Sequence, residues 1–117
     1  MDINFNTKKL QKLCSDHKQL TQKYGAKQAR QISMRLQQLS AADNLLVISK
    51  LPQFRCHELK GNRKGQLAID LIHPLRLVFN VDQKPIPKKL DGGLDWAQSQ
   101  TIKILEIEDY HGKQKKK

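Results

Sequence analysis

The sequence predicts an α+β fold in which an N-terminal strand and a two-helix hairpin pack on an antiparallel-rich sheet. Two observations support this class. Apolar residues recur at helical spacing in the first third of the chain, and apolar and polar residues alternate at strand spacing from about residue 54 onward. The length of 117 residues suits one domain. We expect that domain to span 1–112, followed by a basic, disordered tail over 113–117.

The first third of the chain carries the helical pattern. Residues 2–6, "DINFN", alternate as a short strand, and Thr7 is a plausible N-cap for the helix that follows. That helix has apolar or half-polar residues at helical spacing, namely Leu10, Leu13, Cys14, His17 and Leu20. "YGAKQ" ends it and starts a second helix, whose apolar stripe is Ala29, Ile32, Leu36 and Leu39. The two stripes need a sheet to cover them, which indicates a helical hairpin packed on strands.

The rest of the chain has a β pattern. Residues 40–53 form a connector, with a short helical turn expected at 43–49 before Pro52. "FRCHEL" is a candidate strand, "KGNRKG" a turn, and "QLAIDLI" a strand that resumes as "LRLVFN" beyond the His73-Pro74 step. An excursion over 82–98, rich in glycine, proline and charge, precedes the final strand "TIKILEIE". The expected order is β–α–α–β–β–β.

Charge is the strongest global signal. Lys and Arg number 22 against 11 Asp and Glu, a formal net charge of +11. Residues 1–64 hold 13 basic and 4 acidic residues, whereas 65–117 hold 9 and 7. Such a directed positive field attracts a polyanion, most often a nucleic acid. The simpler alternative is a solubilising surface.

The sequence also points to the cytoplasm. No stretch has the apolar length to span a bilayer, and "MDINFNTKKLQKL" lacks the apolar region of a signal peptide, so we expect no membrane association. Cys14 and Cys56 are expected to be free thiols, since no Cys/His spacing suggests a metal site. No nucleotide-binding or serine-hydrolase motif is present, and we expect no cofactor.

Two short stretches, "CHELKG" and "EDYHG", each place a histidine next to a carboxylate. Cleaving RNA without a metal requires a base for the 2′-hydroxyl, an acid for the leaving oxygen and cations for the phosphorane charge. His, Asp, Glu and Tyr supply the first two functions. Arg63 or Lys64 from the turn and Arg76 from the adjacent strand are expected to converge on one phosphate. The sequence therefore predicts that both stretches belong to one site.

Each of these residues also has an ordinary structural explanation. A lone His57 in a strand is more often packed or solvated than catalytic. Tyr110 has the character of a core aromatic, and the basic residues around Arg63 that of a solvated loop. Arg76 is harder to explain in this way, because a guanidinium inside the apolar "LRLVF" needs a partner or a cleft.

Three blocks resemble the HigB-type toxins of the RelE/ParE superfamily: "LPQFRCHELKGNRKGQLAIDL", "HPLRLVF" and the terminal "ILEIEDYH". The family pattern runs approximately L-P-x-x-R-x-H-x-L-K-G-x-x-x-G, then R-[LI]-x-F, and closes on D-Y-H. The match keeps this order from about residue 3 to residue 111. Two features depart from it: Leu75 stands where many relatives have an aromatic residue, and the 82–98 excursion is longer than the hairpin of compact members.

The resemblance implies a ribosome-dependent mRNA endonuclease, the toxic half of a toxin–antitoxin pair. It implies partnership with a helix-turn-helix, HigA-like antitoxin and with the ribosome and mRNA. By position, the implied catalytic residues are His57, Asp109 and His111, with Lys60 and Arg76 near the scissile phosphate, and Tyr110 stacking on or orienting a base. The substrate-binding set also includes Arg63 and Lys64. For docking on rRNA we expect the basic residues of the helical half: Lys8, Lys12, Lys27, Arg30 and Arg35.

Two other classes of function remain open from the sequence. One is a ParE-like toxin that shares the fold and inhibits a topoisomerase without cutting nucleic acid; the two histidine-containing blocks argue against it. The other is a non-enzymatic RNA- or ribosome-binding module, for which the net charge alone would suffice. The sequence does not give the codon preference, nor which histidine is base and which is acid.

Overall fold

A computed structural model of the chain describes residues 1–110. Its helices are α1 (Lys8–Ser15), α2 (His17–Tyr24), α3 (Ala26–Ala41) and α4 (Leu45–Ser49). Its strands are β1 (Asp2–Phe5), β2 (His57–Glu58), β3 (Leu67–Asp70), β4 (Leu75–Val81) and β5 (Thr101–Asp109). Three short 3-10 turns are η1 (Pro52–Phe54), η2 (Gly61–Arg63) and η3 (Trp96–Gln98). The α+β class expected from the sequence is confirmed.

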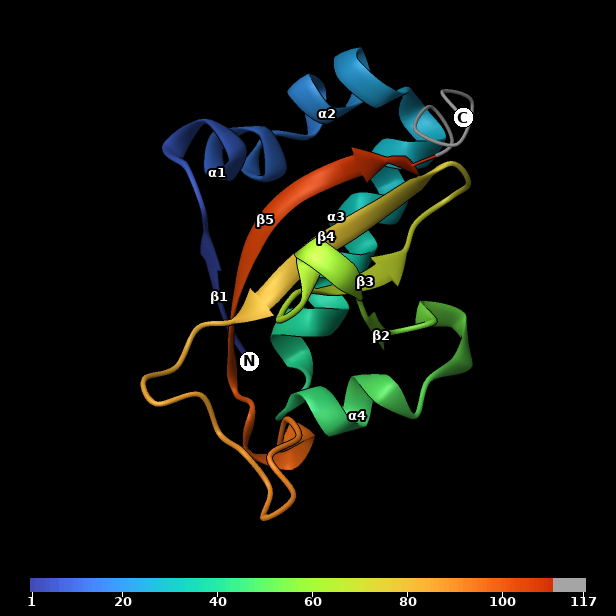
Figure 1. Ribbon diagram of the computed structural model, residues 1–117. Coiled ribbons are helices and arrows are strands. Elements are labelled where there is room, and N and C mark those ends of the chain that lie inside the picture. The colour runs from blue at the N-terminus through green and yellow to red at the C-terminus, as the bar shows by residue number, and fades with distance from the viewer. Residues whose placement is uncertain (111–117) are drawn as a thin grey trace.

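The described strands form one sheet in the order β1-β5-β4-β3-β2. β1 runs parallel to β5, and the other neighbours are antiparallel. α3 lies behind this sheet in Figure 1, and the segment around η2 crosses in front of β4. We call the face turned away from α3 the open face. The antiparallel-rich sheet and the helices packed on one side of it match the expectation.

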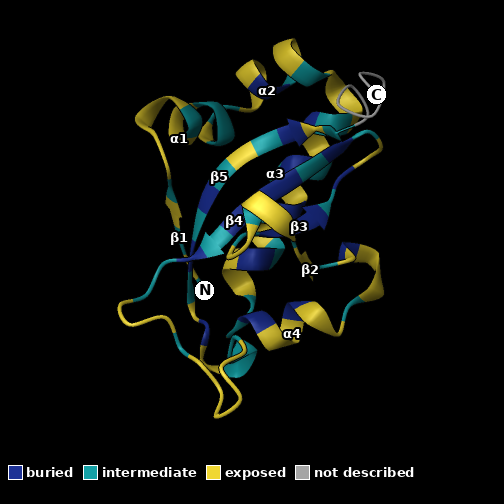
Figure 2. Cartoon of the chain, in the orientation of Figure 1, coloured by how far each residue is buried: buried dark blue, intermediate teal, exposed yellow. Residues whose placement is uncertain are grey.

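The core lies between α3 and the sheet. Alternation along β4 turns Leu75, Leu77 and Phe79 toward the helices, where they meet the α3 stripe that includes Ile32 and Leu39. α1 contributes no buried residue and lies at the rim (Figure 2). Within residues 1–110, no helix is long and apolar enough to cross a membrane.

The expected first helix is divided. Asp16 ends α1 and is also the N-cap of α2, where its side chain accepts hydrogen bonds from the amides of Lys18 and Gln19. A short side chain that satisfies the first free N–H groups of a helix favours a new start at that point. The hairpin is therefore made by α2 and α3, joined at Gly25 with φ of 88°. The Thr7 N-cap and the helical turn within 43–49 are both confirmed.

Two strand predictions need correction. "FRCHEL" forms a strand only at His57–Glu58, because Phe54 belongs to η1 and Arg55 adopts a left-handed conformation with φ of 46°. The segments on either side of His73-Pro74 are two antiparallel strands, β3 and β4, rather than one resumed strand. The described part of the chain thus has one strand more than the expected order.

The 82–98 excursion has its own internal structure. Lys88 and Leu94 form an antiparallel bridge, and the Gly92 amide donates to the Lys89 carbonyl at 2.9 Å to close the turn between them. The Asp95 amide donates to the Pro87 carbonyl at 2.9 Å. The segment is a small hairpin held by backbone hydrogen bonds.

Cys14 and Cys56 are free thiols, as expected, and both are half-buried. Burial raises the pKa of Cys14 to about 11. Burial and then the negative charge of Glu58 raise the pKa of Cys56 to about 12. Both thiols therefore stay protonated, and hence weakly nucleophilic, at neutral pH.

We predict that both cysteines of the folded protein react slowly with iodoacetamide at pH 8.5. An unperturbed thiol is about half ionised at that pH, so unfolding in urea should accelerate alkylation on the order of a hundredfold. Mass spectrometry of timed aliquots measures the rate at each site. Equal rates for folded and unfolded protein would contradict the environments described for these thiols.

Candidate active site

The open face carries a row of charged side chains contributed by neighbouring strands. The register pairs Asp70 of β3 with Arg76 of β4, and Arg76 with Glu108 of β5. Residues that face each other across strands point to the same side of a sheet. These three side chains therefore project together, away from the apolar core side.

Glu108 is the centre of this row. Its side chain is 2 % exposed, and both of its oxygens accept hydrogen bonds from guanidinium groups. Nη1 of Arg63 lies 2.5 Å from Oε2, and Nε and Nη2 of Arg76 lie 2.6 and 2.5 Å from Oε1. A buried carboxylate is tolerated only with such compensation. We refer to Arg63, Arg76, Glu106 and Glu108 as the arginine–glutamate cluster.

Arg63 uses all of its guanidinium nitrogens within the protein. Besides the contact with Glu108, Nη2 lies 2.7 Å from Glu106 and Nε donates to Gln66 at 3.0 Å. Burial lowers the pKa of Arg63, but the hydrogen bonds and charges of Glu106 and Glu108 outweigh it, so the net pKa is raised. Arg63 fastens the η2 loop onto β5.

This arrangement corrects one expectation. Arg63 and Arg76 do converge, but the group between them in the described structure is the Glu108 carboxylate rather than an open phosphate site. Arg63 has its donors committed to three side chains, so it is a structural residue here and not the substrate-binding residue expected from the sequence. Arg76 is different, because its Nη1 takes part in neither contact with Glu108.

Arg76 also lies against an aromatic ring. Its Cζ atom is 4.9 Å from the ring centroid of Tyr110, within cation–π range. The Tyr110 ring in turn meets His73 edge-on, with centroids 6.2 Å apart and an interplanar angle of 90°. From the sequence, His73 was expected only to interrupt two strand segments. Arg76, Tyr110 and His73 bring a cation, a phenol and an imidazole to one end of the open face.

His57 lies on the same open face but apart from the cluster. His57 is exposed on β2. Across the sheet it is in register with Ala68 of β3, Val78 of β4 and Glu106 of β5, so all four side chains lie on the same side. Three strand spacings of about 4.8 Å put β2 roughly 14 Å from β5. The two stretches therefore do not lie on adjacent strands, because β3 and β4 separate them, and the expectation that they form one site stays a prediction.

The environment of His57 fixes the roles of its ring nitrogens. Nδ1 lies 2.7 Å from the backbone carbonyl oxygen of Arg55. A carbonyl oxygen only accepts, so Nδ1 donates the proton and the neutral ring carries its lone pair on Nε2. The Arg55 side chain is held by Asp70 at 3.2 Å, on the same face of the sheet. His57 can thus act as a base through Nε2.

The remaining expected site residues fall into three groups. Lys60 and Lys64 are exposed on either side of η2. Asp109 pairs with Leu75, whose side chain enters the core, so Asp109 leaves β5 on the opposite face from Arg76. His111 lies outside the described residues.

Arg35 is not exposed, contrary to the expectation that it docks on rRNA. It is 7 % exposed, its Cζ lies 4.7 Å from the ring centroid of Phe54, and Nη1 donates to Gln38 at 2.7 Å. Burial lowers the pKa of Arg35. It joins α3 to η1, whereas Lys8, Lys12, Lys27 and Arg30 are exposed as expected for docking residues.

The two glutamates of the cluster were not predicted from the sequence. Strict strand alternation in "TIKILEIEDY" places Glu106, Glu108 and Tyr110 on one face, but it places Ile102 and Ile104 on that same face. A register shift between β4 and β5, at Val78/Phe79, lets these isoleucines enter the core while both glutamates reach Arg63. Alternation alone therefore does not identify Glu108 as the partner of Arg76.

Comparison with known proteins shows which solved structures share this fold. No family model and no curated protein sequence matches the chain. Among solved structures, a YoeB/ParE toxin from Agrobacterium tumefaciens superposes with a TM-score of 0.55 at 12 % identity, over 93 % of this chain and 98 % of that one.

The YoeB–YefM complex from Staphylococcus aureus gives a TM-score of 0.52 at 20 % identity, covering 92 % of this chain and 94 % of that one. The chain therefore has the fold of YoeB and ParE toxins, as the resemblance in its sequence led us to expect. At these identities the likeness establishes the fold, and it does not favour the HigB subgroup over others.

We predict that Glu108→Ala destabilises the fold by about 3–5 kcal/mol, because two guanidinium groups lose the buried carboxylate that compensates them. Glu106→Ala is the matched control. Glu106 is 47 % exposed and, within residues 1–110, its one ion pair is with Arg63, so its loss should cost no more than about 1 kcal/mol. Urea denaturation followed by circular dichroism gives both values. Equal costs for the two variants would show that Glu108 is not the centre of the cluster.

Proposed function

We propose that this protein is the toxin of a type II toxin–antitoxin pair and that it cleaves mRNA on the ribosome, with the HigB-type toxins as the subgroup. The observation that carries the proposal is the open face itself. On a sheet of the YoeB/ParE fold it presents an imidazole with an available Nε2, a positioned arginine and an aromatic ring. These groups suit the cleavage of a phosphodiester by its own 2′-hydroxyl.

Three described residues have distinct roles in the proposed reaction. His57 Nε2 takes the proton of the 2′-hydroxyl, whose oxygen then forms a bond to phosphorus. Arg76, held by Glu108, offers Nη1 to the phosphorane oxygens as negative charge accumulates on them. Tyr110 presents the ring face away from Arg76 for stacking on a base.

Two further roles rest on the resemblance in sequence. His111 protonates the leaving 5′-oxygen as the P–O5′ bond breaks. The catalytic role that the resemblance implies for Asp109 is not part of this proposal, because the pairing of Asp109 with Leu75 places it on the opposite face from Arg76. Lys60, on the loop fastened by Arg63, lies near the scissile phosphate. The products of this chemistry are a 2′,3′-cyclic phosphate and a 5′-hydroxyl, and the reaction needs no metal ion.

The proposed partners follow from the same fold and charge. A cognate antitoxin neutralises the toxin, as the solved YoeB–YefM pair suggests for a protein of this shape. The ribosome and its mRNA are the targets, and the cytoplasm is the compartment. A ParE-like inhibitor of a topoisomerase shares the fold, so the fold does not separate the two functions. Detection of cleaved mRNA distinguishes the endonuclease from the topoisomerase inhibitor.

We predict that the purified protein, added to a translating extract, cuts mRNA that ribosomes are reading and leaves naked mRNA intact. Primer extension locates the cuts, and end analysis should find 2′,3′-cyclic phosphates. His57→Ala should lower the single-turnover rate on the order of a hundredfold, the usual cost of losing an acid–base group. His17→Ala, at an exposed position on α2, is the matched control.

Three results would contradict this reaction. Equal cleavage of naked and translated mRNA would remove the role of the ribosome. An unchanged rate in His57→Ala would remove His57 as the base. Topoisomerase inhibition without any mRNA cleavage would replace the proposal by the ParE-like alternative.

The exposed cations of the helical half form the proposed docking surface for rRNA, namely Lys8, Lys12, Lys27 and Arg30. α1, α2 and the start of α3 lie at the end of the molecule toward which β5 runs (Figure 1). The Gln28 side chain donates to the Ile72 carbonyl at 2.5 Å, which ties the first turns of α3 to the β3–β4 connection. Docking through this surface therefore places the cluster next to the ribosome.

We predict that changing Lys8, Lys12 and Lys27 together to alanine weakens ribosome binding and lowers the slope of log K against log salt by roughly 2–3, about one released counterion per lost phosphate contact. Cleavage at saturating protein should remain near normal. The charge-matched control changes Lys50, Lys84 and Lys89, which are exposed elsewhere. If both triple variants bind alike, the surface is not specific, and if saturating cleavage collapses, these lysines belong to the chemistry.

A further inference from the structure

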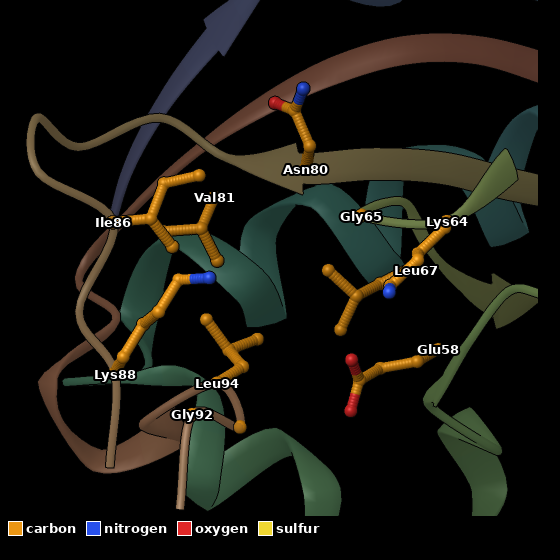
Figure 3. A pocket seen from close by; sticks show the side chains of 11 residues that line it. Glu58, Lys64, Gly65, Leu67, Asn80, Val81, Ile86, Lys88, Gly92 and Leu94 are labelled. Carbon is orange, nitrogen blue, oxygen red and sulfur yellow. The ribbon is translucent and has the colours of Figure 1, made fainter. Parts of the chain in front are cut away.

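A pocket of about 280 Å³ lies at the opposite end of β4 from the cluster. Its walls come from the start of β3, the end of β4, the excursion hairpin, the η2 loop and β2. In Figure 3 the side chains of Lys88, Leu94, Leu67 and Glu58 point toward one another across it. This volume is near the lower end of the ~300–1,000 Å³ range of small-ligand sites, which suits a single flat ring system.

The walls of this pocket are fixed by hydrogen bonds from both sides. On one side the Lys88–Leu94 bridge, closed by the turn at Gly92, presents those two side chains next to each other. On the other side the Leu59 amide donates to the Gln66 carbonyl at 2.8 Å, and Arg63 fastens the loop to β5. The site therefore needs little ordering when a ligand binds.

The lining has the chemistry of a nucleotide site. Its apolar part is aliphatic, with Leu67, Val81, Ile86 and Leu94, and Ile86 is 49 % exposed despite its size. The ammonium groups of Lys64 and Lys88 stand at the rim with the carboxylate of Glu58. Apolar walls take the faces of a base and lysines take phosphates. An ionised carboxylate accepts hydrogen bonds and donates none, so it favours a base with an exocyclic amino group.

The η2 loop connects the pocket to the proposed active site, because the adjacent residues Arg63 and Lys64 contribute to the cluster and to the pocket. The two sites lie on different sides of the sheet. Leu67 pairs with Glu58 and with Phe79, whose side chain enters the core, so the side chains of Glu58 and Leu67 lie on the side opposite Arg76.

We propose that this pocket, lined by Glu58, Lys64 and Lys88, binds a nucleobase with an exocyclic amino group. The inference rests on the proposed function in that the strand is the mRNA. The pocket thereby contributes to the choice of cleavage site. An acidic, apolar peptide of a protein partner is the other occupant that this lining would accept, and the test must separate the two.

The experiment measures fluorescence anisotropy of labelled 2′-deoxy hexanucleotides of adenine, cytosine or uracil, which lack the attacking hydroxyl and stay intact. The adenine and cytosine oligomers should bind about five- to tenfold tighter than the uracil oligomer, because only they donate an amino group to a charged acceptor. Glu58→Gln should abolish this preference. Lys88→Ala should weaken binding and lower the salt slope by about 0.7, the value for one phosphate contact on a single strand.

Lys89→Ala is the matched control. Lys89 is the next residue on the same hairpin, exposed and paired loosely with Asp91 at 3.8 Å. Equal effects of Lys88→Ala and Lys89→Ala, or no base preference in the unmodified protein, would overturn the proposal. The proposal would also be overturned if an acidic peptide bound in a Lys88-dependent way while no oligonucleotide bound.

The outcome is independent of the cleavage assay, since no ribosome is present. Selective, Lys88-dependent binding without ribosomal cleavage would leave the pocket standing and remove the endonuclease. Ribosomal cleavage, together with oligonucleotide binding that is unchanged in the Lys88 and Glu58 variants, would overturn the pocket proposal and leave the endonuclease standing.

Discussion

The buried carboxylate of Glu108 determines how the open face is built. A charge that is 2 % exposed must be compensated, and the chain does so with guanidinium groups from β4 and from the η2 loop. The β4 contact fixes Arg76 beneath Tyr110, and the loop contact holds the segment between Lys60 and Lys64 over the sheet. One ion cluster therefore sets the position of the proposed catalytic cation and the wall of the pocket at the far end of β4.

A guanidinium already paired with a carboxylate is a weaker ligand for phosphate than a free one, because its charge is partly neutralised. It is, however, a better-oriented one. Arg76 gives Nε and Nη2 to Glu108, so its side chain has lost most of its rotamer freedom before any substrate arrives. The cluster exchanges strength of anion binding for preorganisation. That exchange suits a site that must stabilise a transient phosphorane rather than bind RNA tightly in its ground state.

The sequence was informative wherever local chemistry decides the structure. The Thr7 cap, the α3 stripe and the strand alternation of β4 could all be predicted from spacing. The register shift that turns Glu106 and Glu108 of β5 to the open face could not, because strict alternation would place them on the side of Ile102 and Ile104. The sequence was least informative where tertiary contacts decide. Arg35 was expected to be exposed because it is charged, although it lies three residues after Ile32 and four before Leu39, beside the apolar stripe; η1 brings Phe54 against it. The short β2 could not be foreseen either, because the left-handed Arg55 before it has no signature in the sequence.

The separation of His57 from the cluster bears on how such a site works. A base on β2 and a cation on β4, with β3 between them, cannot contact one another across about 10 Å, the width of two strand spacings. They can act on the same phosphodiester only if the RNA lies across the sheet with its 2′-hydroxyl turned to β2 and its phosphate to β4. A free strand adopts that in-line geometry rarely. In the function proposed above, a ribosome that holds the message and receives the helical half of this protein would supply the missing orientation, and orientation of this kind contributes a large part of the barrier reduction in many enzymes. Dependence on the ribosome is thus what the spacing of these groups across the sheet leads one to expect.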